Sequence, residues 1–126
     1  MITSIYTDKA PTPNGHYSQA VKHGEVIYVS CQLGFSDAAN TLPKDFREEC
    51  RQCLRNIQEI IKASGGDIGS ILRVTIYLTD IALWNDVNDL YAEFMQFSKP
   101  ARSIVSVAAL HCHARIGIEA IATVAG

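Results

Sequence analysis

Basic residues are too few in this sequence to form the positively charged surface that nucleic-acid binding requires. The chain has 11 lysines and arginines against 13 aspartates and glutamates, which gives a net charge of −2 and an isoelectric point near 6.0. Nonspecific binding to phosphate backbones depends on clustered basic side chains. We therefore expect no nucleic-acid partner.

Long apolar runs are missing too, and so are the features of a secretion signal. No apolar stretch approaches the roughly 18–20 residues that cross a bilayer. The first residues, MITSIYTDKAP, lack a basic start followed by an apolar core. We expect no membrane association and a cytoplasmic location. The four cysteines, Cys31, Cys50, Cys53 and Cys112, are then expected to be free thiols.

Apolar residues, in contrast, are abundant. They make up 48% of the chain, against 19% charged residues, as in a folded protein with more apolar surface than most. A length of 126 residues fits one domain, 1–126, with a buried core. The apolar excess is compatible with a subunit interface.

The stretch from 45 to 64 has the three-and-four spacing of apolar residues that is typical of an amphipathic helix. Asp45 and Glu48 resemble a capping box at its start, and Gly65-Gly66 provides a left-handed stop at its end. Cys50 and Cys53 form a CxxC pair on the apolar stripe. Because their spacing is wrong for a disulfide and they lie inside the helix, we expect them to be buried and reduced.

A second apolar stripe, from Leu83 to Phe97, predicts another helix. Asp80 is its expected N-cap, and Pro100 lies beyond its end. The residues that follow Pro100 form a β-rich run, so a strand is expected there.

Strand signals surround both helices, at 25–30, 71–78 and 115–124, with His23-Gly24 as a hairpin turn before the first. Two helices on one face of a mixed sheet of about five or six strands predict a two-layer α+β domain. The alternation in 71–78 places Leu72, Val74, Ile76 and Leu78 on one face. Since Ile71, Tyr77 and Ile121 are then on the other face, we expect a second copy of the chain to cover it.

Two charged residues on the last strands are candidates for chemistry. Arg102 opens a strand, and Glu119 lies opposite the main apolar row of 115–124. Each alone is compatible with a solvent-exposed side chain. Together they suggest more, because a guanidinium binds a carboxylate through two parallel hydrogen bonds and a carboxylate can position a water or a proton.

The sequence HCH at 111–113 is a weaker candidate. Adjacent residues of an extended segment point in opposite directions, so at most His111 and His113 could share a ligand. With no third ligand in view, a polar loop is the preferred interpretation, and we expect no metal.

Five motifs occur in the order seen in the reactive-intermediate deaminase family, formerly the YjgF family of enamine/imine deaminases. They are APTPNGHYSQAV (10–21), YVSCQLG (28–34), VNDLYAEFM (87–95), KPARSIVSVAAL (99–110) and IGIEAIA (116–122). This sequence resembles that family over essentially its whole length. The resemblance implies a chorismate-mutase-like fold and a homotrimer with sites between subunits.

The resemblance also implies an activity and the residues that carry it. Family members hydrolyse 2-aminoacrylate, 2-aminocrotonate or their imine tautomers to 2-oxo acids and ammonia without a cofactor. By position, Arg102 matches the carboxylate-binding arginine, and Glu119 the glutamate near the attacking water. Tyr17 matches a tyrosine of the pocket wall, and Asn88 a recurrent asparagine with a supporting role.

Four positions depart from the family pattern. Ile104 replaces the usual cysteine two residues after the arginine, and Cys31 replaces a glycine. His16 and His111 stand where proline is common. Ile104 is expected to line the substrate pocket and narrow the range of substrates, and Cys31 is expected to fill space in the pocket or at the interface. The alternative function is a noncatalytic trimer of the same family that binds small carboxylates.

Overall fold

The computed structural model describes residues 1–36 and 40–125. One six-stranded sheet, ordered β1-β2-β3-β6-β4-β5, carries two α-helices. The elements are β1 (Ile2–Ile5), β2 (Ala20–His23), β3 (Val26–Leu33), α1 (Phe46–Ala63), β4 (Ile71–Leu78), α2 (Trp84–Met95), β5 (Ala101–Ser106) and β6 (Ile116–Thr123). No helix in these residues is long and apolar enough to cross a bilayer.

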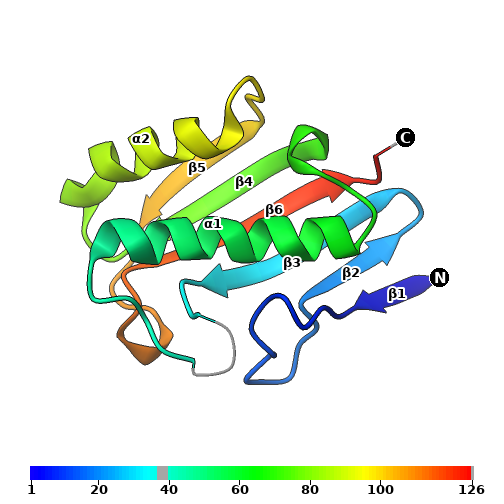
Figure 1. The fold of residues 1–126 in the computed structure, drawn as a ribbon, viewed down its shortest axis with the longest axis horizontal. Coiled ribbons are helices and arrows are strands. Elements are labelled where there is room, and N and C mark those ends of the chain that lie inside the picture. Colours follow the sequence, from blue (N-terminus) through cyan, green and yellow to red (C-terminus); the bar gives the residue numbers. More distant parts are fainter. Residues whose placement is uncertain (37–39, 126) are drawn as a thin grey trace.

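Both helices lie on the same face of the sheet, as Figure 1 shows. Strands β4 and β5 are parallel, with α2 as the crossover between them, whereas the other neighbouring strands are antiparallel. The prediction of a two-layer α+β fold with a mixed sheet is confirmed. The predicted hairpin is confirmed, but its turn lies one residue later, at Gly24-Glu25, because His23 still pairs with Val26 and Gly24 has a φ of +60°.

The core lies between the helices and the sheet. The apolar stripe of α1 packs there, and Cys50 and Cys53 are both fully buried, as predicted. The Cys53 thiol donates a hydrogen bond to the carbonyl of Gln32, at 3.0 Å. Alternate residues of β6 complete the core: Ile116, Ile118, Ala120 and Ala122.

Helix α1 begins as predicted, at an N-cap formed by Asp45. The Asp45 carboxylate accepts a hydrogen bond from the backbone N–H of Glu48, at 3.1 Å. The predicted capping box is only half formed, because the Glu48 side chain pairs with Arg51 instead. At the other end, Gly65 has a φ of +95°, which glycine adopts without strain.

The prediction for the second helix was wrong at both ends. Asp80 caps a short 3₁₀ turn at Ile81–Leu83, and α2 itself starts at Trp84. The helix ends at Met95 because Gln96 has a φ of 55°, outside the helical region. Phe97 therefore lies beyond the helix and is 98% exposed instead of packing on the apolar stripe.

The bounds of β4 match the prediction, but the face assigned to its first residues was wrong. The pairing with β6 shifts register between Ile71 and Arg73. This bulge reverses the alternation, so Ile71 is buried in the core and Leu72 is 51% exposed. Tyr77 does lie on the face away from the helices, beside Gly117 of β6.

An ion pair with a buried carboxylate ties α1 to the start of β6. The fully buried Glu49 carboxylate accepts one hydrogen bond from the Nε of Arg115 and one from its backbone N–H, both at 2.8 Å. The same guanidinium donates to the carbonyls of Pro43 and Lys44. Gly34 lies against this pair, because a Cβ there would be 2.5 Å from the Glu49 carbonyl oxygen.

Candidate functional site

Arg102 lies on the helix-covered side of the sheet, at its β5 edge. It pairs with Val74, whose side chain is buried in the core, so both side chains point toward the helices. The guanidinium donates a hydrogen bond to Oδ1 of Asn88, at 2.9 Å. Its Cζ also lies 4.8 Å from the ring centre of Tyr91 and 5.6 Å from that of Trp84.

A pocket of about 380 Å³ opens beside this guanidinium. Asn88 and Tyr91 of α2, the loop residues Lys99 and Pro100, and Arg102 contribute to its lining. The two cations give the pocket a positive potential, which suits a small anion. We call Arg102, Asn88, Tyr91 and Trp84 the arginine cluster.

Ile104 lies on the same side of β5 as Arg102, because it pairs with the buried Ile76. Its half-buried side chain packs against the core. Ile104 is not among the residues that line the pocket beside Arg102 in the described part of the chain. The pocket in one chain is therefore shaped by α2, the 98–100 loop and Arg102.

Glu119 lies on the opposite, open side of the sheet. It pairs with Thr75 of β4, between the buried neighbours Ile118 and Ala120. Burial raises the pKa of Tyr77, and the negative charge of Glu119 and a hydrogen bond to it raise it further. Burial, followed by the charge of Glu119, also raises the pKa of Cys31 to about 11. Glu119, Tyr77 and Cys31 thus share one site.

Tyr17 and Cys31 line a cleft of about 410 Å³ on the β3 side of the molecule. The Tyr17 hydroxyl donates a hydrogen bond to Oδ1 of Asn14, at 3.0 Å. Leu33, Phe35, Leu110 and His111 add largely apolar walls. Room for the Cys31 sulfur depends on Gly117, since a Cβ there would lie 2.8 Å from it. Glu119 and Tyr77 are not among the residues that line this cleft in the described part of the chain, but both interact electrostatically with Cys31, which does line it. We call the cleft together with these two neighbouring residues the tyrosine cleft.

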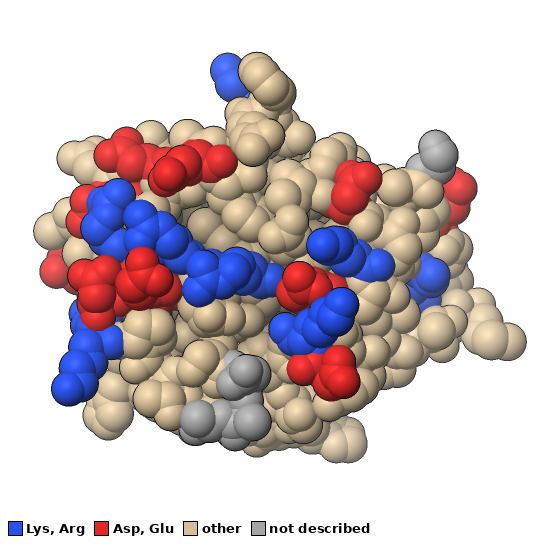
Figure 2. All heavy atoms as spheres, in the orientation of Figure 1, with Lys and Arg blue, Asp and Glu red and all other residues tan. Residues whose placement is uncertain are grey.

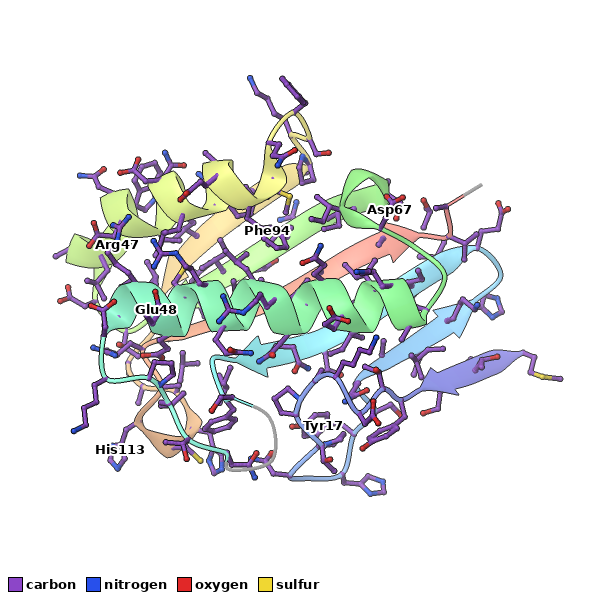
Figure 3. The ribbon with its side chains drawn as sticks, in the orientation of Figure 1. Tyr17, Arg47, Glu48, Asp67, Phe94 and His113 are labelled. Carbon is purple, nitrogen blue, oxygen red and sulfur yellow. The ribbon has the colours of Figure 1, made fainter. Side chains whose placement is uncertain are left out.

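The structure therefore divides the predicted residues into two groups. Arg102 and Asn88 belong to the arginine cluster, beneath α2, whereas Tyr17, Cys31 and Glu119 belong to the tyrosine cleft. Figure 3 shows the separation: Tyr17 lies in the loop near β2, well away from Phe94 on α2. One chain alone does not bring Arg102 and Glu119 together, because they face opposite sides of the sheet.

Sequence reasoning missed the two aromatic residues beside Arg102. Trp84, Asn88 and Tyr91 are spaced at i, i+4 and i+7, so they lie on one face of α2. That spacing is readable from the sequence, but apolar periodicity alone assigns Tyr91 to the core. The contact of the Tyr91 ring with the Arg102 guanidinium can be recognised only from the tertiary structure, in which β5 lies next to α2.

The HCH segment forms an exposed 3₁₀ turn, His111–His113, instead of an extended loop. Cys112 and His113 have positive φ angles of 58° and 61°. Within residues 1–36 and 40–125, no group of three or more His, Cys, Asp or Glu side chains is placed to hold a metal ion. All four cysteines are free.

Comparison with known proteins assigns this arrangement to a family. The family described as endoribonuclease L-PSP matches residues 7–124. The chain belongs to this family. A Bos taurus relative named 2-iminobutanoate/2-iminopropanoate deaminase is 46% identical over 119 residues, which cover 94% of this chain and 87% of that protein.

Solved structures of endoribonuclease L-PSP relatives share the fold. The crystal structure of RidA from an Antarctic Psychrobacter is 36% identical with a TM-score of 0.94, and covers 97% of this chain and 99% of that one. The crystal structure of E. coli TdcF with bound serine is 32% identical with a TM-score of 0.93, and the match covers 98% of this chain and 99% of that one. The resemblance found in the sequence motifs is thereby confirmed.

Proposed function

We propose that this chain hydrolyses reactive 2-enamino and 2-imino acids, of the 2-aminoacrylate and 2-aminocrotonate type, to 2-oxo acids and ammonia. The names of its relatives support this proposal, since mammalian and plant proteins at 40–46% identity are named for imine or reactive-intermediate deamination. We propose Arg102 and Glu119 as catalytic residues, with Tyr17, Cys31, Asn88 and Ile104 around the substrate.

The free donors of Arg102 carry the proposal. In the described part of the chain, its guanidinium makes one hydrogen bond, to Asn88, and has no carboxylate partner. Three other arginines of the chain, Arg47, Arg51 and Arg115, are each paired with a carboxylate. A guanidinium has five N–H donors in a fixed fork, so most of those of Arg102 remain available for a substrate carboxylate.

Hydrolysis then needs a water and a place for protons. Water adds to the C=N carbon of the imine, giving a tetrahedral amino alcohol, whose C–N bond breaks to release ammonia and leave the C=O of the 2-oxo acid. We assign to Glu119 the tasks of orienting this water and passing a proton to the departing nitrogen. Because the imine is already electrophilic, positioning by Arg102 supplies much of the remaining rate enhancement.

We further propose that the site forms between subunits of a homotrimer. Arg102 of one copy would complete the tyrosine cleft of the next, which would bring together the two groups that a single chain keeps apart. The open face of the sheet supports this arrangement, since Tyr28 and Val105 are 48% and 41% exposed there. A rotationally repeated contact of this kind closes into a ring.

Mixing two inactive variants tests the shared site. Arg102→Ala and Glu119→Gln should each be inactive in 2-aminocrotonate hydrolysis, monitored by ammonia release. If each site uses Arg102 from one subunit and Glu119 from another, subunits mixed after dissociation should recover about a quarter of wild-type activity. A mixture as inactive as its parents would contradict a shared site. Sedimentation as a stable monomer would contradict the trimer.

Measurements on the wild-type chain separate the alternatives. A wild-type chain that binds 2-oxobutanoate but releases no ammonia would be the noncatalytic carboxylate binder. The family description refers to RNA cleavage, so RNA degradation is measured in parallel. The charge pattern favours deamination: Figure 2 shows lysines and arginines along the helical face interspersed with acidic residues, and the salt bridges Arg47–Asp86 and Arg51–Glu48 belong to this pattern.

A cytoplasmic location is part of the proposal. All four cysteines are free in the structure, and Cys112 is exposed. An exposed free thiol is better preserved in a reducing compartment than outside the cell. Fractionation that finds the chain outside the cytoplasm would contradict this part alone.

A further inference from the structure

We propose that Trp84 and Tyr91 are positioning residues, whose aromatic rings hold the Arg102 guanidinium in the orientation that binds the substrate carboxylate. This inference rests on the proposed function, because it assigns a task to residues that serve Arg102. The family names found in the comparisons assign no role to either ring.

The geometry of α2 carries the argument. Trp84, Asn88 and Tyr91 project from one face of this helix, and all three contact the same guanidinium. Asn88 holds one N–H through its Oδ1, while both rings lie within the distance of about 6 Å at which a cation is attracted to an aromatic ring. One amide and two rings therefore restrain a side chain that has four rotatable bonds.

The type of contact explains why aromatic residues suit this place. A carboxylate near Arg102 would pair with it and occupy the donors that a substrate needs. An aromatic ring attracts the cation through its electrons without accepting hydrogen bonds from the fork. The rings thus fix the guanidinium while leaving its N–H groups free.

Tyr91 has a second unusual feature. The residue is 7% exposed, and its hydroxyl is buried without a hydrogen-bond partner among the described residues. A buried hydroxyl without a partner is normally costly. Phenylalanine at this position would present the same ring face to Arg102 and would avoid the cost of the buried hydroxyl. The ring can therefore be tested separately from the hydroxyl.

Paired substitutions test the rings. Tyr91→Leu and Trp84→Leu remove an aromatic face but keep an apolar side chain, whereas Tyr91→Phe and Trp84→Phe keep a ring. We expect each leucine variant to raise the KM for 2-aminocrotonate about 3- to 30-fold, with a much smaller change in kcat. The phenylalanine variants should keep the KM near the wild-type value.

Phe94→Leu is the matched control. Phe94 is an aromatic residue of the same helix, but it lines a separate groove with Arg51, Leu54 and Leu90. Its replacement should lower stability without changing the KM. If Tyr91→Leu behaves like Phe94→Leu, and loses only thermal stability, the inference is overturned.

A second readout does not depend on turnover. Trp84 is the single tryptophan of the chain, so intrinsic fluorescence reports directly on the surroundings of Arg102. Titration with 2-oxobutanoate should change this emission, and titration with butanone, which lacks the carboxylate, should not. The change should be absent in Arg102→Ala and should need about 3- to 30-fold more 2-oxobutanoate in Tyr91→Leu.

The outcomes distinguish the two proposals. Full activity of Arg102→Ala would overturn the proposed function and, with it, the task assigned to the rings. An inactive Arg102→Ala together with an unchanged KM in Tyr91→Leu and Trp84→Leu, and an unchanged titration in Tyr91→Leu, would overturn the positioning role alone. An equal emission change in wild type and Arg102→Ala would also count against it.

Discussion

Strand β6 presents two different surfaces on alternate residues. Ile116, Ile118, Ala120 and Ala122 face the helices and are at most 4% exposed. Glu119, Ile121 and Thr123 face the other way and are only partly buried. The covered surface is apolar and closely packed, whereas the open surface carries a carboxylate beside a tyrosine and a thiol. The first surface packs into the core, whereas Glu119, one of the two proposed catalytic residues, lies on the second.

The largest expected effect is on the open surface. Glu119→Gln keeps the shape of the side chain but removes its ability to take and return a proton. We expect kcat for 2-aminocrotonate to fall about 100- to 10,000-fold, which is the usual contribution of a general acid or base. The measurement is steady-state ammonia release, with thermal unfolding as the control for folding. Retained activity would remove Glu119 from the mechanism.

Two isoleucines of β6 allow a matched test of the two surfaces. Ile118→Ala empties a site in the closed core and should cost about 2–5 kcal/mol in the free energy of unfolding. Ile121→Ala, on the open surface, should cost the separated chain about 1 kcal/mol or less. Urea unfolding at several protein concentrations distinguishes a loss of folding from a loss of association. Equal costs for both would remove the distinction between the surfaces.

The ion pair between Glu49 and Arg115 allows a further test on the covered side. Glu49→Gln removes the charge that receives two hydrogen bonds from Arg115. We expect the free energy of unfolding to fall by about 1–3 kcal/mol, because one of the two hydrogen bonds from Arg115 becomes weak or is lost. Glu48→Gln, on the exposed side of the same helix turn, is the control and should change stability by well under 1 kcal/mol.

Thiol reactivity gives the smallest effect. At pH 8, iodoacetamide should label exposed Cys112 quickly and the other three cysteines slowly, because Cys50 and Cys53 are buried and the pKa of half-buried Cys31 is raised to about 11. Labelling of Cys31 should accelerate as the pH rises toward 11. Mass spectrometry of peptides identifies each site. Rapid labelling of Cys31 at pH 8 would contradict its protected position.

The raised pKa of Cys31 also predicts the direction in which stability changes with pH. Cys31 keeps its proton in the folded chain up to about pH 11, whereas an unfolded thiol loses it near the ordinary value of 9.0. The folded state therefore binds more protons between these values, and its stability should decrease as the pH rises through that range.

Periodicity in the sequence was sufficient for some of the elements. It placed α1 and β4 within about one residue of their ends, because an apolar stripe and a strict alternation each follow from local geometry. It failed at Leu72 and Phe97, where a bulge and a helix end interrupt the period. Neither interruption carries a proline or glycine that would mark it in the sequence.

The site was less accessible to the same reasoning. Alternation shows that Arg102 and Ile104 lie on the same side of β5. It does not show whether Glu119 of β6 lies on that side of the sheet or on the opposite side. The answer depends on the parallel pairing of β5 with β4, which β6 in turn joins in antiparallel register. Pairings between distant segments are tertiary facts, so the sequence named the candidate residues but could not show that one chain separates them.

The position of β6 in the sheet has a consequence for how the chain folds. Although β6 is the last strand to be synthesised, it lies in the interior, between β3 and β4. Until residues 116–123 are available, the β1–β3 sheet and the β4–α2–β5 unit each expose an unpaired edge, and α1 has no complete surface to cover. Such edges invite pairing with other chains, and contacts between distant segments form slowly. The native sheet therefore cannot be completed until residues 116–123 have been synthesised.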